Sequence, residues 1–504
     1  MSDAKTQPAP EPSVPFARGV TVMPEWFAHE GVDFVLDRVE ALGATAIATS
    51  PYVLERCADG SGAREPPPDG EAGKVRPLDR DLFGARELFV RTAPAFPHDM
   101  SRYRGLRYQP SLPSPLTHAN EDLLDRACEA AARRGIHVYM QVMAASPPGY
   151  RVQFSGAHAQ DQCLLPDGRV HDRRVDRNAS LASAHVVDYT SALVAEIATR
   201  YPSVAGIRLD WPEYPPYDFR SALFDFNPAM TARMAEAGFD PHDVARDVIA
   251  WADGIRSAVR GAASSGADAM LRALAGADFD AMFDADGVLA TLHDAKRDAA
   301  RDLLAAVRAS LDEVPGTRRR LEPQAFPPPF PRISGFPLDR LAGIADTVGI
   351  KLYTMHWPMI ARYWARDLLG DDAAAAAHDA LTAALAWRFG FTDDIADGAT
   401  LRYPEPGTPH PVGARAQAHK LLRAQELAGD VPVIAFVHSY GPVEDVVHRR
   451  DIAAAAGMPV WINRYGYLSD EKIGALGSPT RPSIPHATPP AMPDGPDIPT
   501  VKRR

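Results

Sequence analysis

The sequence predicts a (β/α)8 barrel. Short apolar segments of strand length alternate with amphipathic helical segments, the alternation repeats eight times, and the chain is 504 residues long. Strands that alternate with helices pair in parallel, and a barrel of eight such units with insertions uses about 250 residues or more. The alternative is an open doubly wound sheet, but neither G-x-G-x-x-G nor a P-loop follows the early strands.

Eight segments are predicted to form the strands, because each is a short apolar run bounded by turn-forming residues. In chain order they are 19–23, 46–50, 137–143, 206–210, 318–322, 348–356, 431–438 and 459–464. The fifth is expected to end before Pro323, since proline cannot donate a hydrogen bond within a central strand.

Helical periodicity fills most intervals between these strands. In the first helix Val32, Val35 and Val39 share one face, and Gly43 ends it. Further helices are expected near 120–134, 186–197, 335–346, 358–390, 412–428, 442–456 and 469–476. The interval 51–117 is predicted to be a long loop, and 219–315 a helical insertion. The barrel domain is thus assigned to 18–477, between proline-rich tails at 1–17 and 478–504 that are expected to be disordered.

The composition excludes several classes of protein. The formal net charge is -11 and no basic stripe is present, so nucleic acid is not an expected partner. No apolar run is long enough to span a membrane, and the N-terminal residues lack the apolar core of a signal peptide. Cys57, Cys128 and Cys163 are scattered, as is typical of reduced thiols. These features predict a cytoplasmic protein.

The fourth strand carries the most informative segment of the chain. Arg208 and Asp210 are two residues apart, so both point to the same face of the strand. Charges that face into a parallel sheet are costly unless they meet each other or a ligand. Trp211, Glu213 and Tyr214 follow at once. Carboxylates beside aromatic rings suit a sugar, which offers hydroxyl groups at its edges and C–H groups on its faces. The alternative is a plain salt bridge that closes the sheet.

Further polar and aromatic residues lie where other strands end. Active sites of (β/α)8 barrels lie at the C-terminal ends of the strands. The strand ends after the fourth provide Glu322, Tyr353, His356, Trp357, His438, Tyr440, Asn463 and Arg464. Neither His-x-His after the first strand nor His-Glu-x-x-His occurs, so no metal and no cofactor are predicted.

Two of these segments carry a family resemblance. Gly206-Ile-Arg-Leu-Asp-Trp-Pro-Glu-Tyr-Pro215, together with Lys351-Leu-Tyr-Thr-Met-His-Trp-Pro358, resembles a group of glycoside-hydrolase-like barrels over about 18–477. The G-x-R-x-D part also resembles the α-amylase-like glycosidases. That resemblance implies that Asp210 is the nucleophile, Arg208 its charge partner and Glu322 the acid/base. In the amylase-like pattern His438 would be followed by aspartate, whereas Ser439 stands here.

The sequence therefore predicts a glycoside hydrolase of the retaining type that uses a carboxylate pair, with Asp210 and Glu322 catalytic and Glu213 as the substitute acid. The alternatives are that Glu322 is a salt-bridge partner, that His356 and His438 are structural, and that Trp211 and Trp357 belong to the core. The residues expected to bind the carbohydrate are Arg208, Trp211, Tyr214, Tyr353, His356, Trp357, His438, Tyr440, Asn463 and Arg464. The rival functions are a catalytically silent carbohydrate-binding barrel and a metal-dependent or phosphate-binding lyase.

Overall fold

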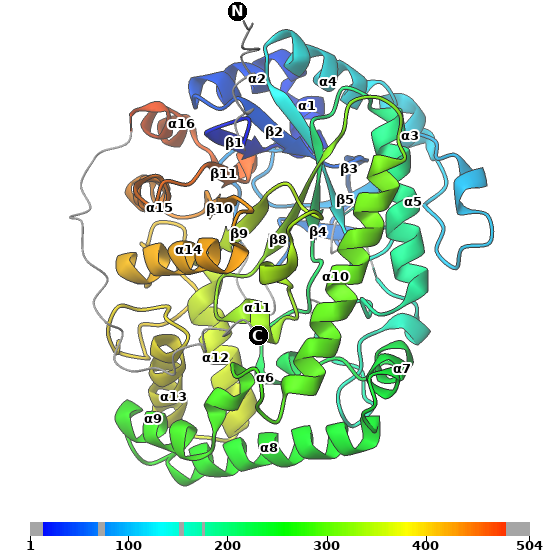
Figure 1. The fold of residues 1–504 in the computed structure, drawn as a ribbon. Coiled ribbons are helices and arrows are strands. Elements are labelled where there is room, and N and C mark those ends of the chain that lie inside the picture. Colours follow the sequence, from blue (N-terminus) through cyan, green and yellow to red (C-terminus); the bar gives the residue numbers. More distant parts are fainter. Residues whose placement is uncertain (1–13, 69–75, 151–155, 174–176, 480–504) are drawn as a thin grey trace, which may run out of the picture.

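Eight parallel strands form a closed barrel at the centre of the molecule (Figure 1). The computed structural model describes residues 14–68, 76–150, 156–173 and 177–479. In chain order the barrel strands are β1 (Arg18–Thr21), β2 (Ala46–Thr49), β6 (His137–Met143), β7 (Gly206–Asp210), β8 (Arg320–Ala325), β9 (Val348–Leu352), β10 (Val433–His438) and β11 (Val460–Asn463). Each pairs with its neighbours in parallel, and β1 closes the ring against β11. The predicted (β/α)8 barrel is confirmed.

Helices surround this barrel (Figure 1). The helices before the insertion are α1 (Pro24–Glu30), α2 (Val32–Ala41), α3 (Pro115–Asn120), α4 (Leu123–Arg133) and α5 (Ala184–Arg200). Between β7 and β8 lie α6 (Phe219–Ala222), α7 (Pro228–Glu236), α8 (Pro241–Gly261), α9 (Ala267–Gly276) and α10 (Ala290–Asp312). The remaining helices are α11 (Phe330–Ile333), α12 (His356–Leu369), α13 (Ala375–Arg388), α14 (Ala414–Ala428), α15 (Val443–Ala455) and α16 (Asp470–Gly477). The long helix α8 crosses the bottom of Figure 1, far from β1 and β2.

Local sequence explains why α8 forms. Asp240 caps its N-terminus by accepting a hydrogen bond from the His242 backbone, and Pro241 occupies the first turn, where no N–H is needed. Val248 and Ile255 lie among the buried residues of one face. The helix therefore packs its apolar side against α7 and α9 of the insertion and against α12.

Side chains fill the interior of the barrel. Phe436 and Trp461, from β10 and β11, belong to a buried cluster inside the ring. The Arg208 guanidinium carbon lies 3.9 Å from the centroid of the Trp461 ring. A Cβ atom at Gly19 would lie 2.2 Å from that ring, so only glycine fits on β1 at this level. The barrel is a packed core, as its eight strands require.

The segment predicted to be one long loop at 51–117 contains a small sheet, so that prediction is wrong. The sheet is antiparallel, with β5 (Leu88–Pro94) between β3 (Tyr52–Cys57) and β4 (Ala63–Glu65). Leu88 and Val90 alternate with more exposed residues along β5. This period of two marks a strand, although glycine- and proline-rich sequence separates the three short segments.

Several predicted boundaries also need correction. Pro323 does not end β8: it pairs with β7, and the strand continues by pairing with β9 from Gln324 onward. The sixth strand stops at Leu352, because the chain turns into α12 at His356. The helix predicted at 335–346 is reduced to a 3-10 turn, Leu338–Arg340. The helix predicted at 358–390 is divided into α12 and α13.

The tails expected to be disordered fall mainly outside the described residues, which begin at 14 and end at 479. Among the helices of the described part, none combines the length and the apolar character that a membrane span needs.

Candidate active site

Asp210 ends β7 and points toward the C-terminal end of the barrel, where its side chain is 13% exposed. Its Oδ1 atom accepts a hydrogen bond from the Trp211 backbone at 3.0 Å. The same oxygen lies 3.0 Å from Nζ of Lys351, which comes from β9. Lys351 was not among the predicted site residues. The available signal was a charged residue within the otherwise apolar strand Val348–Leu352.

Lys351 also contacts a second carboxylate. Its Nζ atom lies 3.2 Å from Oε1 of Glu213, and the lysine is almost fully buried. Because Asp210 Oδ1 and Glu213 Oε1 contact the same nitrogen, the two carboxylates are close neighbours on either side of one ammonium group. Burial by itself would lower the pKa of Lys351, but the two carboxylates together raise it above its usual value. Lys351 is therefore a permanent ammonium between them.

Glu213 is completely enclosed. Besides Lys351, its carboxylate accepts hydrogen bonds from the Phe326 backbone at 3.0 Å and from Ser334 Oγ at 2.9 Å. Burial raises the pKa of Glu213, against the opposing effect of Lys351 and of the hydrogen-bond donors. This residue thus connects the segment after β7 to the segments after β8.

Arg208 and Glu322 lie inside the barrel, both without exposed surface. Arg208 Nε is 3.3 Å from Glu322 Oε1, and its Nη1 donates to Thr21 and Gln141. Strand register places Arg208 directly beside Glu322, whereas Asp210 lies two residues further along β7. The expected pairing of Arg208 with Asp210 is therefore corrected: Lys351 is the ion-pair partner of Asp210. Burial lowers the pKa of Arg208 and raises the pKa of Glu322, so each charged form depends on the other.

Aromatic and imidazole rings continue from Asp210 along the same end of the barrel. The Trp211 and Tyr217 ring centroids are 6.0 Å apart, and Tyr217 lies 5.8 Å from His356. The Tyr353 ring lies 5.6 Å from His356 and 5.2 Å from His438. These side chains, with Asp210, Lys351, Tyr440, Asn463 and Arg464, are called the rim below.

The last strands fix the far part of the rim. Asn463 donates a hydrogen bond from Nδ2 to the Tyr353 hydroxyl at 2.9 Å. The Tyr440 hydroxyl donates to the Pro404 carbonyl at 3.0 Å. Arg464 Nη2 lies 2.8 Å from Glu65, and the arginine side chain is 16% exposed. Burial, followed by the nearby guanidinium of Arg76, holds the pKa of His438 well below its usual value, so this imidazole is neutral.

Two residues expected to bind sugar belong to the core. Trp357 lies in the first turn of α12 and stacks on Phe391, with ring centroids 5.1 Å apart and planes 19° apart. Tyr214 is 1% exposed, and its hydroxyl accepts a hydrogen bond from the Leu181 backbone at 3.1 Å. The prediction that these two rings are sugar platforms is corrected accordingly.

The described ranges contain no group of three or more histidine, cysteine, aspartate or glutamate side chains arranged to hold a metal ion.

No family model and no curated protein sequence matches this chain. Solved structures are similar at the level of the barrel. The catalytic domain of β-amylase from Paenibacillus polymyxa has a TM-score of 0.41 and 9% identity, over 92% of this chain and 95% of that chain. A chitinase from Chromobacterium violaceum has a TM-score of 0.37 and 10% identity, over 91% and 98%. An α-amylase from Malbranchea cinnamomea has a TM-score of 0.22 and 11% identity, over 73% and 76%. At this level of similarity the names of these proteins carry no information on the activity of this chain.

Proposed function

We propose that this protein is a glycoside hydrolase in which Asp210 and Glu213 form the catalytic carboxylate pair. The observation that carries this proposal is the contact of both carboxylates with Lys351, at 3.0 Å and 3.2 Å. Retaining glycosidases place their two carboxyl groups about 5–5.5 Å apart, whereas inverting enzymes leave a wider gap for water. The close approach through a shared ammonium favours the retaining mechanism.

The two carboxylates differ in a way that suits two roles. The contacts of Asp210 converge on Oδ1, so Oδ2 is the oxygen that attacks the anomeric carbon. Glu213 has a pKa that burial raises, as a general acid requires. In the proposed mechanism, substrate binding opens the enclosed site of Glu213, and its carboxyl group then protonates the departing glycosidic oxygen. In the second step Glu213 removes a proton from the water that releases the sugar from Asp210. Glu213 thus replaces Glu322, whose partner is Arg208 inside the barrel.

The remaining rim residues suit the recognition of a carbohydrate. Trp211 and Tyr353 present rings to the C–H faces of a sugar, and Asn463 and Arg464 offer hydrogen-bond donors to its hydroxyl groups. His356 lies between these groups, where it can exchange hydrogen bonds with sugar hydroxyls. His438 supports the site from behind, because its two ring nitrogens contact Arg76 and the Tyr440 backbone. The ligand is therefore held by rings and polar side chains on one end of the barrel.

A second candidate is a carbohydrate-binding barrel without hydrolytic activity. It is favoured by the complete burial of Glu213, which accepts hydrogen bonds from the Phe326 backbone and from Ser334. These contacts are also typical of a structural carboxylate that connects loops by hydrogen bonds. In this case the rim binds sugar and Asp210 serves as a hydrogen-bond acceptor.

Hydrolysis of a panel of 4-nitrophenyl glycosides and of the matching disaccharides separates the two candidates. We expect turnover by the wild-type protein and its loss in Asp210→Asn. Glu213→Gln should slow disaccharide cleavage strongly and spare the aryl glycosides, because a good leaving group needs little protonation. Asp302→Asn is the control, since this carboxylate pairs with Arg233 on the outer helices.

Sugar binding by the wild-type protein without any turnover would favour the silent barrel. Equal loss of disaccharide and aryl glycoside cleavage in Glu213→Gln would contradict the role of Glu213 as the acid.

A further inference from the structure

A cleft of about 890 Å³ opens beside the rim, between α12, α13 and the segment 400–411. Ligand sites usually measure about 300–1,000 Å³, so this volume accommodates a ligand larger than a single sugar ring. Its lining includes Arg362, Tyr363, Arg366, Arg402, Tyr403 and Glu405. The mechanism proposed above uses none of them.

The cleft borders the rim at one aromatic side chain. The ring of Tyr403, which lines the cleft, lies 6.3 Å from the ring of His356 and 6.1 Å from that of Tyr440. Both of these belong to the rim. The cleft therefore lies next to the rim, on the side of His356 and Tyr403.

The lining has the chemistry of a site for a neutral, hydroxyl-rich ligand. Arginines and acidic residues are both present, and Arg362 is neutralised by Asp379 at 2.9 Å. This near balance of charge favours neither an anion nor a cation, while it supplies hydrogen-bond donors and acceptors in number. Tyr363, Tyr403 and nearby prolines add the apolar surfaces on which sugar rings pack.

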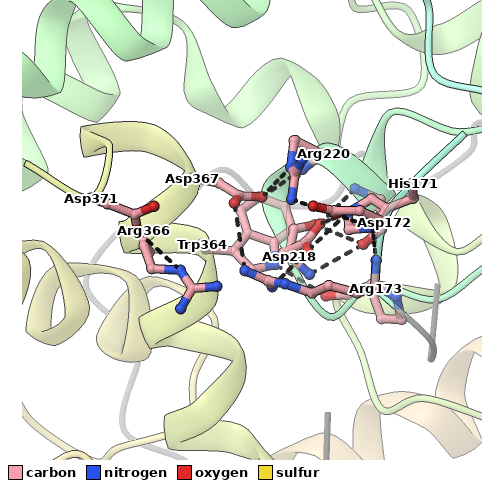
Figure 2. Close-up of polar contacts among 11 residues, drawn as sticks. His171, Asp172, Arg173, Asp218, Arg220, Trp364, Arg366, Asp367 and Asp371 are labelled. Atoms are coloured by element: carbon pink, nitrogen blue, oxygen red, sulfur yellow. Dashed lines mark hydrogen bonds and ion pairs between the residues drawn. The ribbon is translucent and has the colours of Figure 1, made fainter. Parts of the chain in front are cut away.

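One wall of the cleft is held in place by an ionic cluster around two buried aspartates, Asp218 and Asp367, shown in Figure 2. The guanidinium carbon of Arg173 lies 4.4 Å from the centroid of the Tyr363 ring. Asp218 holds Arg173 at 2.7 Å, and Asp367 lies 3.4 Å from Arg220. Both aspartates are buried, so the cluster is held by contacts within the protein. The Tyr363 ring is therefore in position before a ligand binds.

Arg366 differs from these arginines. Figure 2 shows it apart from the cluster, with Asp371 beside it. Its Nε is 3.5 Å from Asp371, and the two side chains are 43% and 85% exposed. An exposed pair of this kind contributes little stability, so a ligand hydroxyl can replace it at low cost.

We propose that this cleft binds the sugar units of a neutral oligosaccharide that extend beyond the rim, so that the substrate is a chain and not a small glycoside. The inference rests on the proposed function for the orientation of the chain: the bond over Asp210 is cleaved and the cleft holds units on one side of it. Arg366 and Tyr403 then contact the substrate only when the chain is long enough.

Binding to the full-length Asp210→Asn protein tests this proposal without hydrolysis. Calorimetric titrations would use cello-, malto-, manno-, xylo- and chito-oligosaccharides of two to six units. We expect at least one series in which affinity rises with length. In that series Arg366→Ala should weaken binding of the hexasaccharide about 3–10-fold, the value of one or two hydrogen bonds, and leave the disaccharide unchanged.

Arg415→Ala is the matched control, since Arg415 is also about half exposed and lies 3.6 Å from an equally exposed aspartate, Asp394. Tyr403→Phe should keep the length dependence and Tyr403→Ala should abolish it. Equal affinity at every length, or equal effects of Arg366→Ala on short and long chains, would overturn the proposal. Length-dependent binding without turnover by the wild type would contradict the proposed hydrolysis and leave oligosaccharide binding in the cleft intact. Turnover without length-dependent binding would contradict the role of the cleft and leave the proposed hydrolysis intact.

Discussion

The ion pair of Arg208 and Glu322 gives the sharpest test of which carboxylate serves the chemistry. The perturbations are Glu322→Leu, Arg208→Met and the two together. If Glu322 belongs to the barrel interior, as its contact with Arg208 at 3.3 Å and its lack of exposure indicate, it affects stability and not turnover.

The contacts set the expected magnitudes. In Glu322→Leu the guanidinium stays in place, since Thr21 and Gln141 still accept its hydrogen bonds and Trp461 lies beneath it. Removal of one partner of a buried pair costs about 3–5 kcal/mol, because the other charge remains buried. Replacement of both by apolar side chains of similar size is neutral or stabilising by about 1–4 kcal/mol. The two losses should therefore not add, and the coupling free energy should be at least about 6 kcal/mol, the sum of the two smallest single losses.

Urea unfolding of the four proteins at pH 7, with glycoside turnover measured in parallel, provides the assay. We expect two destabilised single variants and a double variant close to the wild type in both stability and turnover. Additive losses of stability would show that the two charges do not interact. A stable Glu322→Leu protein without turnover would restore Glu322 as the acid and refute the interior role.

Three further predictions concern buried groups. Lys351→Met should cost about 3–5 kcal/mol of unfolding free energy at pH 8. The deficit should shrink at pH 5, because burial raises the pKa of Glu213 and the folded protein takes up a proton as the pH falls; urea titrations at both values check this. Burial lowers the pKa of Lys420 to about 7, so above that pH the unfolded chain binds more protons than the folded protein does. The unfolding free energy of the wild type should therefore rise from pH 7 to 9, and this rise should be smaller in Lys420→Met. Gly19→Ala should cost about 1–3 kcal/mol, visible as a lower Tm, because the new methyl group meets the Trp461 ring.

The strands of the barrel could be predicted closely because each is a short apolar run with clear ends. For β6 and β7 the predicted and observed limits are the same, 137–143 and 206–210. The period of two along β7 also placed Arg208 and Asp210 correctly on one face. It could not reveal which neighbour each would meet, because that depends on the register with β8 and β9.

The same limit explains the residues that were misassigned. Lys351 became the partner of Asp210 only through the packing of β9 near β7, although a lone charge in an apolar strand was visible in the sequence. Trp357 follows the sixth strand closely in sequence, but the chain has already turned into α12, whose buried face takes the ring. Distance along the sequence from a strand end therefore did not measure distance from the rim.

The rim and the cleft differ in how the chain must come together to form them. Segment 359–411 alone lines the cleft, so its parts meet by closing short loops. The rim joins Asp210 to Lys351 and Arg464 to Glu65, within a ring that closes only when β1 pairs with β11. Contacts between distant parts of a chain form late in folding, because closing the long loop between them costs conformational entropy. The recovery of sugar binding at the rim during refolding therefore reports the completed ring, whereas the packing of α12 against α13 does not require it.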